Sequence, residues 1–394
     1  MSKQYTKWVA TWGNGISRTE CLPADYAKNI TFRYPIVSCF DGNKIRLRFS
    51  NFTGTEPVTL SEVTVAKTLS GSSVDEETMT MVTFHGEVSV TMQPGEQVVS
   101  DEIDFCIQSR EEFSVSIYLK DYTQMREGVM AFGPLSPGYY FYGDYAKAGV
   151  PNRNDERKTQ CFYFLNTVDI LTEEKNHAIV CFGDSITSQS WPDELQKLCW
   201  EHQITNVSVI RRAVCGSRIL REYDCIEYAA YGLKGATRFP LEIDTAGADQ
   251  LIILHGINDI IHPVGKEINV FRPMSDMPTV DDLINGIKSI YLAPLAGTGW
   301  KIYGATALPF GGWRTYADFR EEVRNALNEW FRTTDAFDGC IDFDRAVRDP
   351  EHLSYFHPEC DSGDHLHPSE EGHYRMAKEA FRVIFRFDSR GKEK

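Results

Sequence analysis

The sequence lacks the features that mark membrane, nucleic-acid-binding and low-complexity proteins. No apolar run approaches the roughly 18 residues that a membrane-spanning helix needs, and no segment is repeated or strongly biased in composition. Basic residues are outnumbered: the net charge of −15 at pH 7 argues against nucleic acid or an anionic membrane as a partner. These absences favour a globular protein that acts on a neutral or weakly polar molecule.

The ten cysteines include no Cys-x-x-Cys pair, which is the spacing typical of zinc sites and redox motifs. The stretch from Met1 to Trp12 also lacks the apolar core of a secretory signal. We therefore expect mostly reduced, buried thiols and a cytoplasmic location.

The first part of the chain has a β-strand pattern. With 394 residues, the chain is long enough for two domains. Short stretches of alternating polarity, separated by Gly and Pro, fill residues 1–172 without helical patterns between them. Residues 29–40 and 44–50 flank an Asp-Gly pair, which predicts a β-hairpin. We expect an all-β domain of jelly-roll or sandwich type over residues 1–172.

The pattern changes in residues 173–394, where apolar strand-like runs alternate with helical segments. Residues 178–182 and 250–255 are apolar runs, and residues 319–333 have apolar and charged residues at helical spacing. This alternation predicts an α/β domain with a doubly wound parallel sheet. In such sheets ligands bind outside the carboxyl ends of the strands.

Three polar blocks follow predicted strands in this region. The first is Gly183-Asp184-Ser185, where a serine at a helix start would expose its hydroxyl to backbone N–H groups that favour negative charge. Gly216 could bring its N–H close to an oxyanion because no side chain intervenes. The Asn258 amide is a neutral, directional donor of the kind that stabilises oxyanions. Each block alone also fits an ordinary turn or helix cap.

A fourth block, from Asp364 to His367, precedes the last predicted helix. Its spacing lets the carboxylate hold the imidazole Nδ1–H while Nε2 faces Ser185. A metal site is the competing interpretation, because histidines crowd this region: His352, His357, His365, His367 and His373. We expect no metal and no cofactor, and we expect Asp184 and Asp259 to serve loop hydrogen bonding rather than proton transfer.

Together the four blocks resemble the SGNH (GDSL-type) hydrolase superfamily, which has them in the same order. The resemblance covers about residues 177–390. It implies that Ser185 is the nucleophile, that His367 acts as general base and then as acid, and that Asp364 orients the imidazole.

The resemblance also implies an oxyanion hole formed by the N–H groups of Ser185 and Gly216 and the side chain of Asn258. The β-rich part in front is similar to two-domain members in which a jelly-roll-like module precedes the hydrolase, several of which are carbohydrate O-acetylesterases. We therefore expect a serine esterase that deacetylates short xylan- or mannan-type oligosaccharides. Trp191 and Trp313 are candidates for contact with the sugar.

Two alternatives remain open. One is a general short-chain acyl esterase or thioesterase, which needs the same triad but no sugar site. The other is a carbohydrate-binding protein in which the hydrolase domain is inert, although the complete set of Ser185, Asp364 and His367 argues against it.

Overall fold

The computed structural model describes residues 3–18, 25–152 and 154–385. It divides into two compact units. The first consists of Met1–Ala178, Ile204–Arg211 and Asp244–Ala248, and the second of Ile179–Gln203, Arg212–Ile243 and Asp249–Lys394. The domain boundary between residues 172 and 173 stays a prediction.

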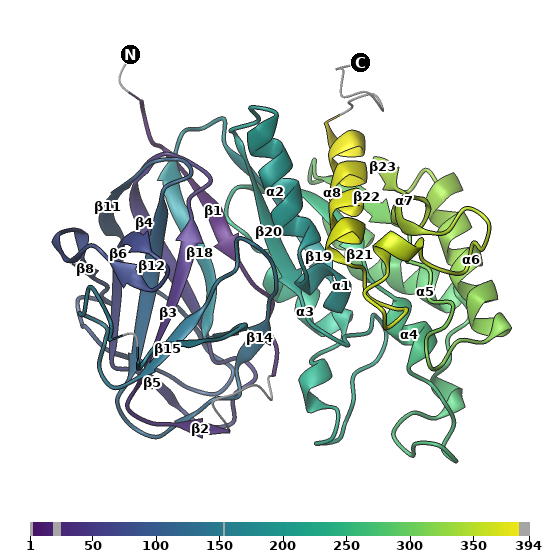
Figure 1. Cartoon of the computed structure of the whole chain (residues 1–394), viewed down its shortest axis with the longest axis horizontal. Helices are drawn as coiled ribbons and strands as arrows, with labels where there is room; N and C mark the ends of the chain where they lie inside the picture. The colour runs from purple at the N-terminus through teal and green to yellow at the C-terminus, as the bar shows by residue number, and fades with distance from the viewer. Residues whose placement is uncertain (1–2, 19–24, 153, 386–394) are drawn as a thin grey trace. The chain divides into compact units, whose positions relative to one another are not determined.

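The first unit is built almost entirely of β strands (Figure 1). They are β1 (Lys7–Gly13), β2 (Tyr26–Ala27), β3 (Ile30–Val37), β4 (Gly42–Ser50), β5 (Val58–Leu60), β6 (Glu62–Ser70), β7 (Ser73–Val74), β8 (Thr80–Met81), β9 (Val90–Met92), β10 (Gln97–Val99), β11 (Ile103–Ile107), β12 (Glu112–Leu119), β13 (Thr123–Gln124), β14 (Gly128–Met130), β15 (Tyr139–Tyr142), β16 (Arg157–Lys158), β17 (Cys161–Tyr163) and β18 (Leu165–Thr172). A short 3₁₀ helix, η1 (Glu76–Thr78), interrupts them.

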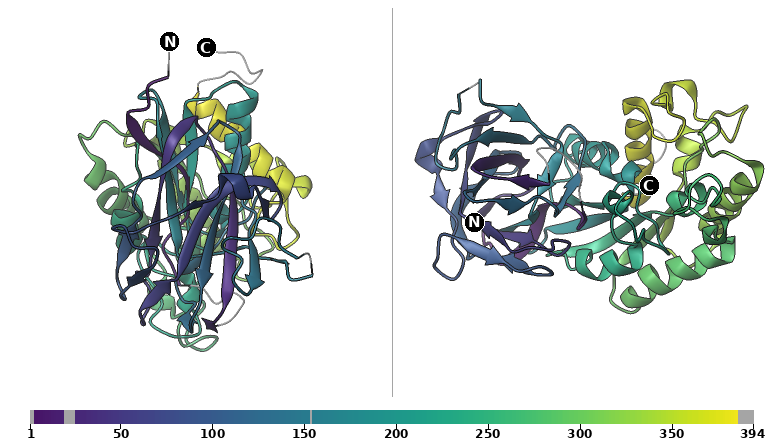
Figure 2. Two further views of the ribbon diagram at one scale, coloured as in Figure 1. Left: turned by 90° about the vertical axis from the view of Figure 1, so that its left-hand side faces the viewer. Right: turned by 90° about the horizontal axis from the view of Figure 1, so that it is seen from below.

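These strands pair in antiparallel fashion into two larger sheets. One has the order β1-β18-β4-β10, with β11 also paired to β4. The other has the order β16-β15-β3-β12-β6-β7, with β8 also paired to β6. Figure 2 shows the strands of this unit from two further sides. Three two-stranded sheets, β13-β2, β14-β17 and β5-β9, complete the unit. The all-β prediction for this part of the chain is confirmed.

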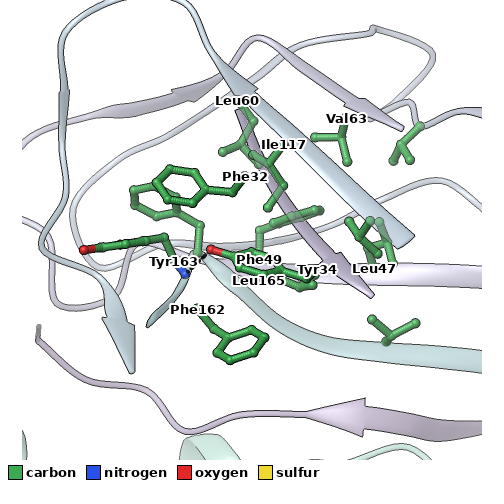
Figure 3. Close-up of a cluster of buried hydrophobic side chains, with 14 of the residues drawn as sticks. Phe32, Tyr34, Leu47, Phe49, Leu60, Val63, Ile117, Phe162, Tyr163 and Leu165 are labelled. Atoms are coloured by element: carbon green, nitrogen blue, oxygen red, sulfur yellow. Dashed lines mark hydrogen bonds between the residues drawn. The ribbon is translucent and has the colours of Figure 1, made fainter. Parts of the chain in front are cut away.

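Aromatic and aliphatic side chains from both larger sheets form one buried core (Figure 3). Phe32 on β3 lies 5.0 Å from the ring centre of Tyr163, and Tyr34 lies 4.8 Å from that of Phe162. Phe49 on β4 joins the same cluster. Inward-facing residues of two sheets thus share one apolar layer, as in a β sandwich.

The predicted hairpin between β3 and β4 is wrong. β3 pairs with β12 and β15, whereas β4 pairs with β18, β10 and β11, so the two strands belong to different sheets. The connection passes through Ser38, Cys39 and Phe40, which are buried, and the Ser38 hydroxyl donates to the Phe40 carbonyl at 2.6 Å. Alternating polarity determines which face of a strand is buried, but it does not select the partner strand.

Five further strands form a second type of sheet. They are β19 (His177–Gly183), β20 (Val207–Ala213), β21 (Ala248–Leu254), β22 (Lys301–Ala305) and β23 (Gly339–Ile341), in the order β20-β19-β21-β22-β23. β21, β22 and β23 pair in parallel. The order reverses at β19, because the next two strands in the chain lie on opposite sides of it. Such a switch point is where open α/β sheets bind ligands.

Eight α-helices accompany this sheet in the described residues. They are α1 (Ser185–Ser188), α2 (Trp191–Glu201), α3 (Gly235–Glu242), α4 (Ile257–Ile261), α5 (Val280–Ile287), α6 (Asp318–Thr333), α7 (Phe343–Val347) and α8 (Glu370–Ile384). Helical turns of 3₁₀ or π type are η2 (Ala229–Tyr231), η3 (Met274–Asp276), η4 (Lys288–Leu292), η5 (Ala293–Leu295) and η6 (Pro358–Cys360). α2 packs on α8, whereas α5 packs on α6 (Figure 1). The predicted α/β fold is confirmed.

Eight cysteines of the described residues are free thiols: Cys39, Cys106, Cys181, Cys199, Cys215, Cys225, Cys340 and Cys360. Cys161 is disulfide-bonded, so the expectation of reduced thiols does not extend to it. Within the described ranges, no helix is both long and apolar enough to cross a membrane.

Candidate active site

Ser185 lies at the point where β19 becomes α1. The strand residues Ala178 to Phe182 are fully buried, and Gly183 ends the strand in a crowded position. A Cβ atom at Gly183 would lie 2.3 Å from the Thr187 hydroxyl and 2.4 Å from the Leu254 carbonyl oxygen. The Asp184 carboxylate then caps α1 by accepting from the Ile186 N–H at 3.1 Å. This local geometry leaves Ser185 half-buried as the first helical residue.

A hydrogen-bond relay joins Ser185 to the loop before α8. The Ser185 Oγ lies 2.9 Å from His367 Nε2, and His367 Nδ1 lies 2.6 Å from an Asp364 carboxylate oxygen. The other Asp364 oxygen accepts from the backbone N–H groups of Leu366, at 2.9 Å, and His367, at 2.8 Å. Burial would raise the pKa of Asp364, but the hydrogen bonds from His367 and these backbone groups lower it to about 2.

Gly216 and Asn258 follow the strands on either side of β19. Gly216 has φ +76°, and a Cβ atom there would lie 2.4 Å from the Tyr231 ring, so the backbone conformation and the space both favour glycine. Asn258 is buried at the start of α4, and its Nδ2 donates to the Ser217 carbonyl at 3.1 Å. In the part of the chain that the structure describes, the N–H groups of Ser185 and Gly216 donate to no other residue.

Arg238 on α3 connects two of these blocks, and the sequence analysis missed it. Its guanidinium is fully buried, pairs with Glu242 at 2.8 Å and lies 4.5 Å from the Phe182 ring centre. The same group donates to the Gly183 carbonyl at 2.9 Å and to the Ser217 hydroxyl at 3.3 Å. An Arg and a Glu four residues apart are common on exposed helices, so the sequence carried no signal of this role.

His255 extends this network beneath the site. Its Nε2 lies 3.0 Å from the Ser217 hydroxyl, and its Nδ1 lies 2.7 Å from the Tyr291 hydroxyl. Burial, together with the charge of Arg238, lowers the pKa of His255 to about 3. A neutral imidazole at neutral pH therefore links the turn that holds Gly216 to the helical region after β21.

Asp184 and Asp259 hydrogen-bond their own surroundings, as expected from the sequence. Asp259 accepts from the backbone N–H groups of Ile219, at 2.8 Å, and Leu220, at 3.1 Å. Burial raises the pKa of Asp184 to about 7 and that of Asp259 to about 6, although the hydrogen bonds to each carboxylate oppose this shift. Both carboxylates shape the loops that carry the site.

We expect Arg238→Met to lower the free energy of unfolding by about 3–5 kcal/mol, because it removes one charge of a fully buried ion pair. The double variant Arg238→Met/Glu242→Met should recover part of that loss, since it leaves no carboxylate without its guanidinium. Urea unfolding of the two variants and the wild type measures both effects. Arg382 forms an exposed ion pair with Glu379, so Arg382→Met is the matched control. It should change the free energy of unfolding by less than about 1 kcal/mol. A fully stable single variant would contradict the inferred role of the pair.

The two tryptophans proposed for sugar contact differ in exposure. Trp191 is fully buried, and its ring centre lies 5.2 Å from that of Phe343. A side chain with no exposed surface cannot contact a substrate, so the predicted contact between Trp191 and the sugar is wrong. The residue begins α2, and its ring packs into the protein core. Trp313 is half-buried and remains a candidate.

The histidine-rich region does not gather its side chains around one point. His365 Nδ1 lies 2.6 Å from Asp361, whereas His373 Nε2 lies 2.8 Å from the Gln189 side-chain oxygen. Across the described residues, no group of three or more His, Cys, Asp or Glu side chains could hold a metal ion. His365 and His373 therefore bond different polar partners and do not converge on one point.

Comparison with known proteins gives one family match. The model of the GDSL-like lipase/acylhydrolase family matches residues 181–375, which include Ser185, Gly216, Asn258, Asp364 and His367. No curated protein matches the chain.

Solved structures with some likeness to the chain are distant. A member of the lipolytic G-D-S-L family from Veillonella parvula is 18% identical, covers 54% of this chain and 100% of its own, and has a TM-score of 0.35. A carbohydrate acetylesterase from Xanthomonas citri is 8% identical, with 84% and 71% covered and a TM-score of 0.35. The catalytic domain of a peptidoglycan O-acetyltransferase from Streptococcus pneumoniae is 11% identical, with 53% and 92% covered and a TM-score of 0.30.

Proposed function

Because this chain belongs, through residues 181–375, to the GDSL-like lipase/acylhydrolase family, we propose that it is a serine esterase that removes acetyl groups from acetylated carbohydrates. The observation that carries the proposal is the relay from Ser185 Oγ to His367 Nε2 and from His367 Nδ1 to Asp364. A serine hydroxyl is a weak nucleophile until a neighbouring base accepts its proton, and this relay provides such a base.

In the first step, the Ser185 oxygen attacks the acetyl carbonyl carbon while His367 Nε2 takes the hydroxyl proton. The resulting tetrahedral intermediate collapses when the sugar oxygen leaves and His367 returns the proton to it. The acetyl group is then an ester of Ser185. A water molecule repeats the sequence on this ester, so that acetate leaves and the Ser185 hydroxyl is restored. Asp364 keeps the imidazole oriented and stabilises its charged form.

Negative charge develops on the carbonyl oxygen during both attacks. We assign its stabilisation to the N–H groups of Ser185 and Gly216 and to the amide of Asn258. Support comes from the two backbone N–H groups, which donate to no residue in the described ranges. The Asn258 amide donates one of its two hydrogens to the Ser217 carbonyl, and the other can donate to an oxyanion.

We expect Asn258→Ala to lower kcat by about 10²–10³ while the protein stays folded, because it removes one oxyanion donor. Aryl acetate hydrolysis by purified wild type and variant measures the change. Asn328→Ala is the matched control: this equally buried amide bonds the backbone of Ala307, so its loss should affect stability and leave kcat per folded molecule unchanged. Near-normal turnover in the Asn258 variant would remove the residue from the oxyanion hole.

Support for a sugar as the leaving group comes from the surroundings of Trp313. The preceding residue, Gly312, has positive φ, and a Cβ atom there would lie 3.0 Å from the His365 ring. His365 is two residues from His367, so the half-buried Trp313 belongs to the neighbourhood of the relay. An aromatic face beside a small acyl site suits an acetylated oligosaccharide.

The acyl group and the leaving group can be tested together. We expect acetate release from acetylated xylo- or manno-oligosaccharides, and we expect aryl acetate to be hydrolysed faster than aryl octanoate. A preference for octanoyl esters without release from any sugar would instead favour the second candidate, a general acyl esterase or thioesterase. If the protein bound sugar but hydrolysed none of the esters, an inert carbohydrate-binding protein would be favoured.

We keep the remaining sequence-based expectations as proposals. The substrate is a small acetylated oligosaccharide, and no nucleic acid or membrane takes part. The cytoplasmic location also stays a proposal, and the disulfide at Cys161 is an observation against it, because disulfides persist in oxidising compartments.

A further inference from the structure

A cluster of rings and guanidinium groups lies beside the oxyanion donors and has no part in the mechanism above. It consists of Arg218, Tyr223, Tyr228, Tyr231, His262 and Arg272, which we call the tyrosine–arginine cluster. Its members come from two long segments, 218–234 and 262–279, which extend below α3 and α4 in Figure 1. Loops of this length in a compact domain are often functional.

The cluster adjoins both candidate oxyanion positions. A Cβ atom at Gly216 would lie 2.4 Å from the Tyr231 ring, so this ring covers the glycine directly. At the other end, the His262 N–H donates to the Asn258 carbonyl at 3.2 Å, one turn further along. The rings of Tyr231 and His262 stack with centres 5.0 Å apart. A group bound in this cluster would therefore be next to the carbon that Ser185 attacks.

Both arginines are buried against tyrosine faces. Arg218 is 3% exposed and its guanidinium lies 4.3 Å from the Tyr223 ring centre. Arg272 is 8% exposed and lies 4.5 Å from the Tyr228 ring centre. Stacking of this kind holds a guanidinium in place and leaves its edge free to donate hydrogen bonds.

The two buried arginines differ in their ion pairs, since the charges of Asp276 and Asp259 both act on Arg218. Asp276 lies 3.6 Å from Arg218 and 3.5 Å from the exposed Arg221, whereas Arg272 forms no ion pair within the described ranges. Arg272 donates a long hydrogen bond to the Tyr231 hydroxyl, at 3.4 Å. Burial and the neighbouring arginines hold the pKa of His262 well below its usual range, so the imidazole adds no charge at neutral pH.

Several buried polar atoms of the cluster also lack a partner. Among the described residues, the Nε atoms of Arg218 and Arg272 and the hydroxyl of Tyr223 have no hydrogen-bond partner. Buried charged donors without an acceptor are costly, and such groups in a native protein usually meet a water or a ligand. An anionic group would satisfy these donors and give Arg272 an ion-pair partner.

We propose that the tyrosine–arginine cluster binds a carboxylate of the substrate, so that the preferred substrates are acylated sugars that carry a carboxylate, such as acetylated uronic acids. This inference rests on the proposed esterase function. A carboxylate is planar and accepts from the edge of a guanidinium in the geometry that arginine provides. The cluster would hold the sugar through its acid group while Ser185 attacks a neighbouring acetyl ester.

The test compares two substrates that differ only in charge: an acetylated methyl glucuronoside and its uncharged carboxamide. We expect the wild type to prefer the acid in kcat/KM by about 10- to 100-fold, the size of a hydrogen-bonded charge. Arg272→Met should abolish this preference, and Arg272→Lys should retain part of it. Arg382→Met removes an exposed arginine paired with Glu379 and should show the wild-type ratio. Equal kcat/KM for acid and carboxamide in the wild type would overturn the proposal.

A binding measurement keeps this test separate from the esterase proposal. In Ser185→Ala, calorimetric titration should show tighter binding of glucuronate than of glucuronamide, and loss of this difference on adding Arg272→Met. Hydrolysis of aryl acetate without any acid preference would contradict the carboxylate site alone. Failure to hydrolyse any ester would contradict the esterase proposal, and glucuronate binding would still decide the carboxylate site.

Discussion

Ser185→Ala should lower kcat for aryl acetate by about 10⁵–10⁶, because removal of a serine nucleophile leaves only binding and oxyanion stabilisation. The hydroxyl lies 2.9 Å from His367 Nε2, and its loss eliminates the acyl-enzyme route altogether. Stopped assays with high enzyme concentration measure the residual rate. A fluorophosphonate probe should label the wild type and fail to label the variant.

The matched control for this experiment is Ser289→Ala. The Ser289 hydroxyl donates to the Asn285 carbonyl at 2.7 Å on a helix outside the relay. This variant should keep both labelling and turnover. If Ser185→Ala retained labelling, or lost less than about tenfold in kcat, another residue would have to be the nucleophile.

Asp364→Asn should lower kcat by about 10⁴, the second-largest effect we expect. An amide at this position can donate to His367 Nδ1, which puts the imidazole proton on Nε2. A protonated Nε2 in the neutral ring can no longer accept the serine proton. The fold should be retained, because the amide is close in size to the carboxylate. Aryl acetate hydrolysis measures kcat, and circular dichroism confirms the fold.

Asp361→Asn provides a closely matched control for this substitution. Asp361 lies in the same loop and holds His365 Nδ1 at 2.6 Å, the same distance at which Asp364 holds His367. Only the second of these imidazoles reaches Ser185, so Asp361→Asn should cost far less activity. Similar losses in both variants would indicate a general effect on the loop and would contradict the specific role of Asp364.

The low pKa of Asp364 adds a pH dependence. The pKa is lowered to about 2 in the folded protein, below the usual value near 4 of an aspartate. The stability that the carboxylate contributes is therefore present above pH 4 and is lost as the pH falls toward 2. In acid unfolding experiments, Asp364→Asn should lose less stability than the wild type over this interval.

Several features could be predicted because they depend on local sequence. Strands and helices alternate in the second half of the chain, and a parallel sheet needs a long crossover between strands, so the α/β class follows. Ser185, Gly216 and Asn258 follow strands, and residues at the carboxyl ends of such strands converge on one edge. The order of these residues and of Asp364 and His367 was likewise readable along the chain.

Other features could not be predicted because they depend on residues far apart in the sequence. The alternating patterns of β3 and β4 are compatible with pairing to each other, yet the two strands lie in different sheets. Trp191 is near Ser185 in sequence but is buried under Phe343, because helical periodicity turns it toward the core. The same limit hid Arg238, whose donation to Gly183 and Ser217 depends on how α3 folds back on the sheet.

The sequence by itself determined the β class of the first part of the chain, the change to an alternating α/β pattern and the order of the candidate catalytic residues, since these follow from short-range periodicity and spacing. The tertiary structure alone decided which strands pair, which aromatic rings are buried and that Ser185, His367 and Asp364 lie within hydrogen-bond distance. It also decided that two arginines from separate segments are buried in the cluster whose Tyr231 ring covers Gly216. Contacts between distant residues are set by packing of the whole unit, and no local pattern encodes them.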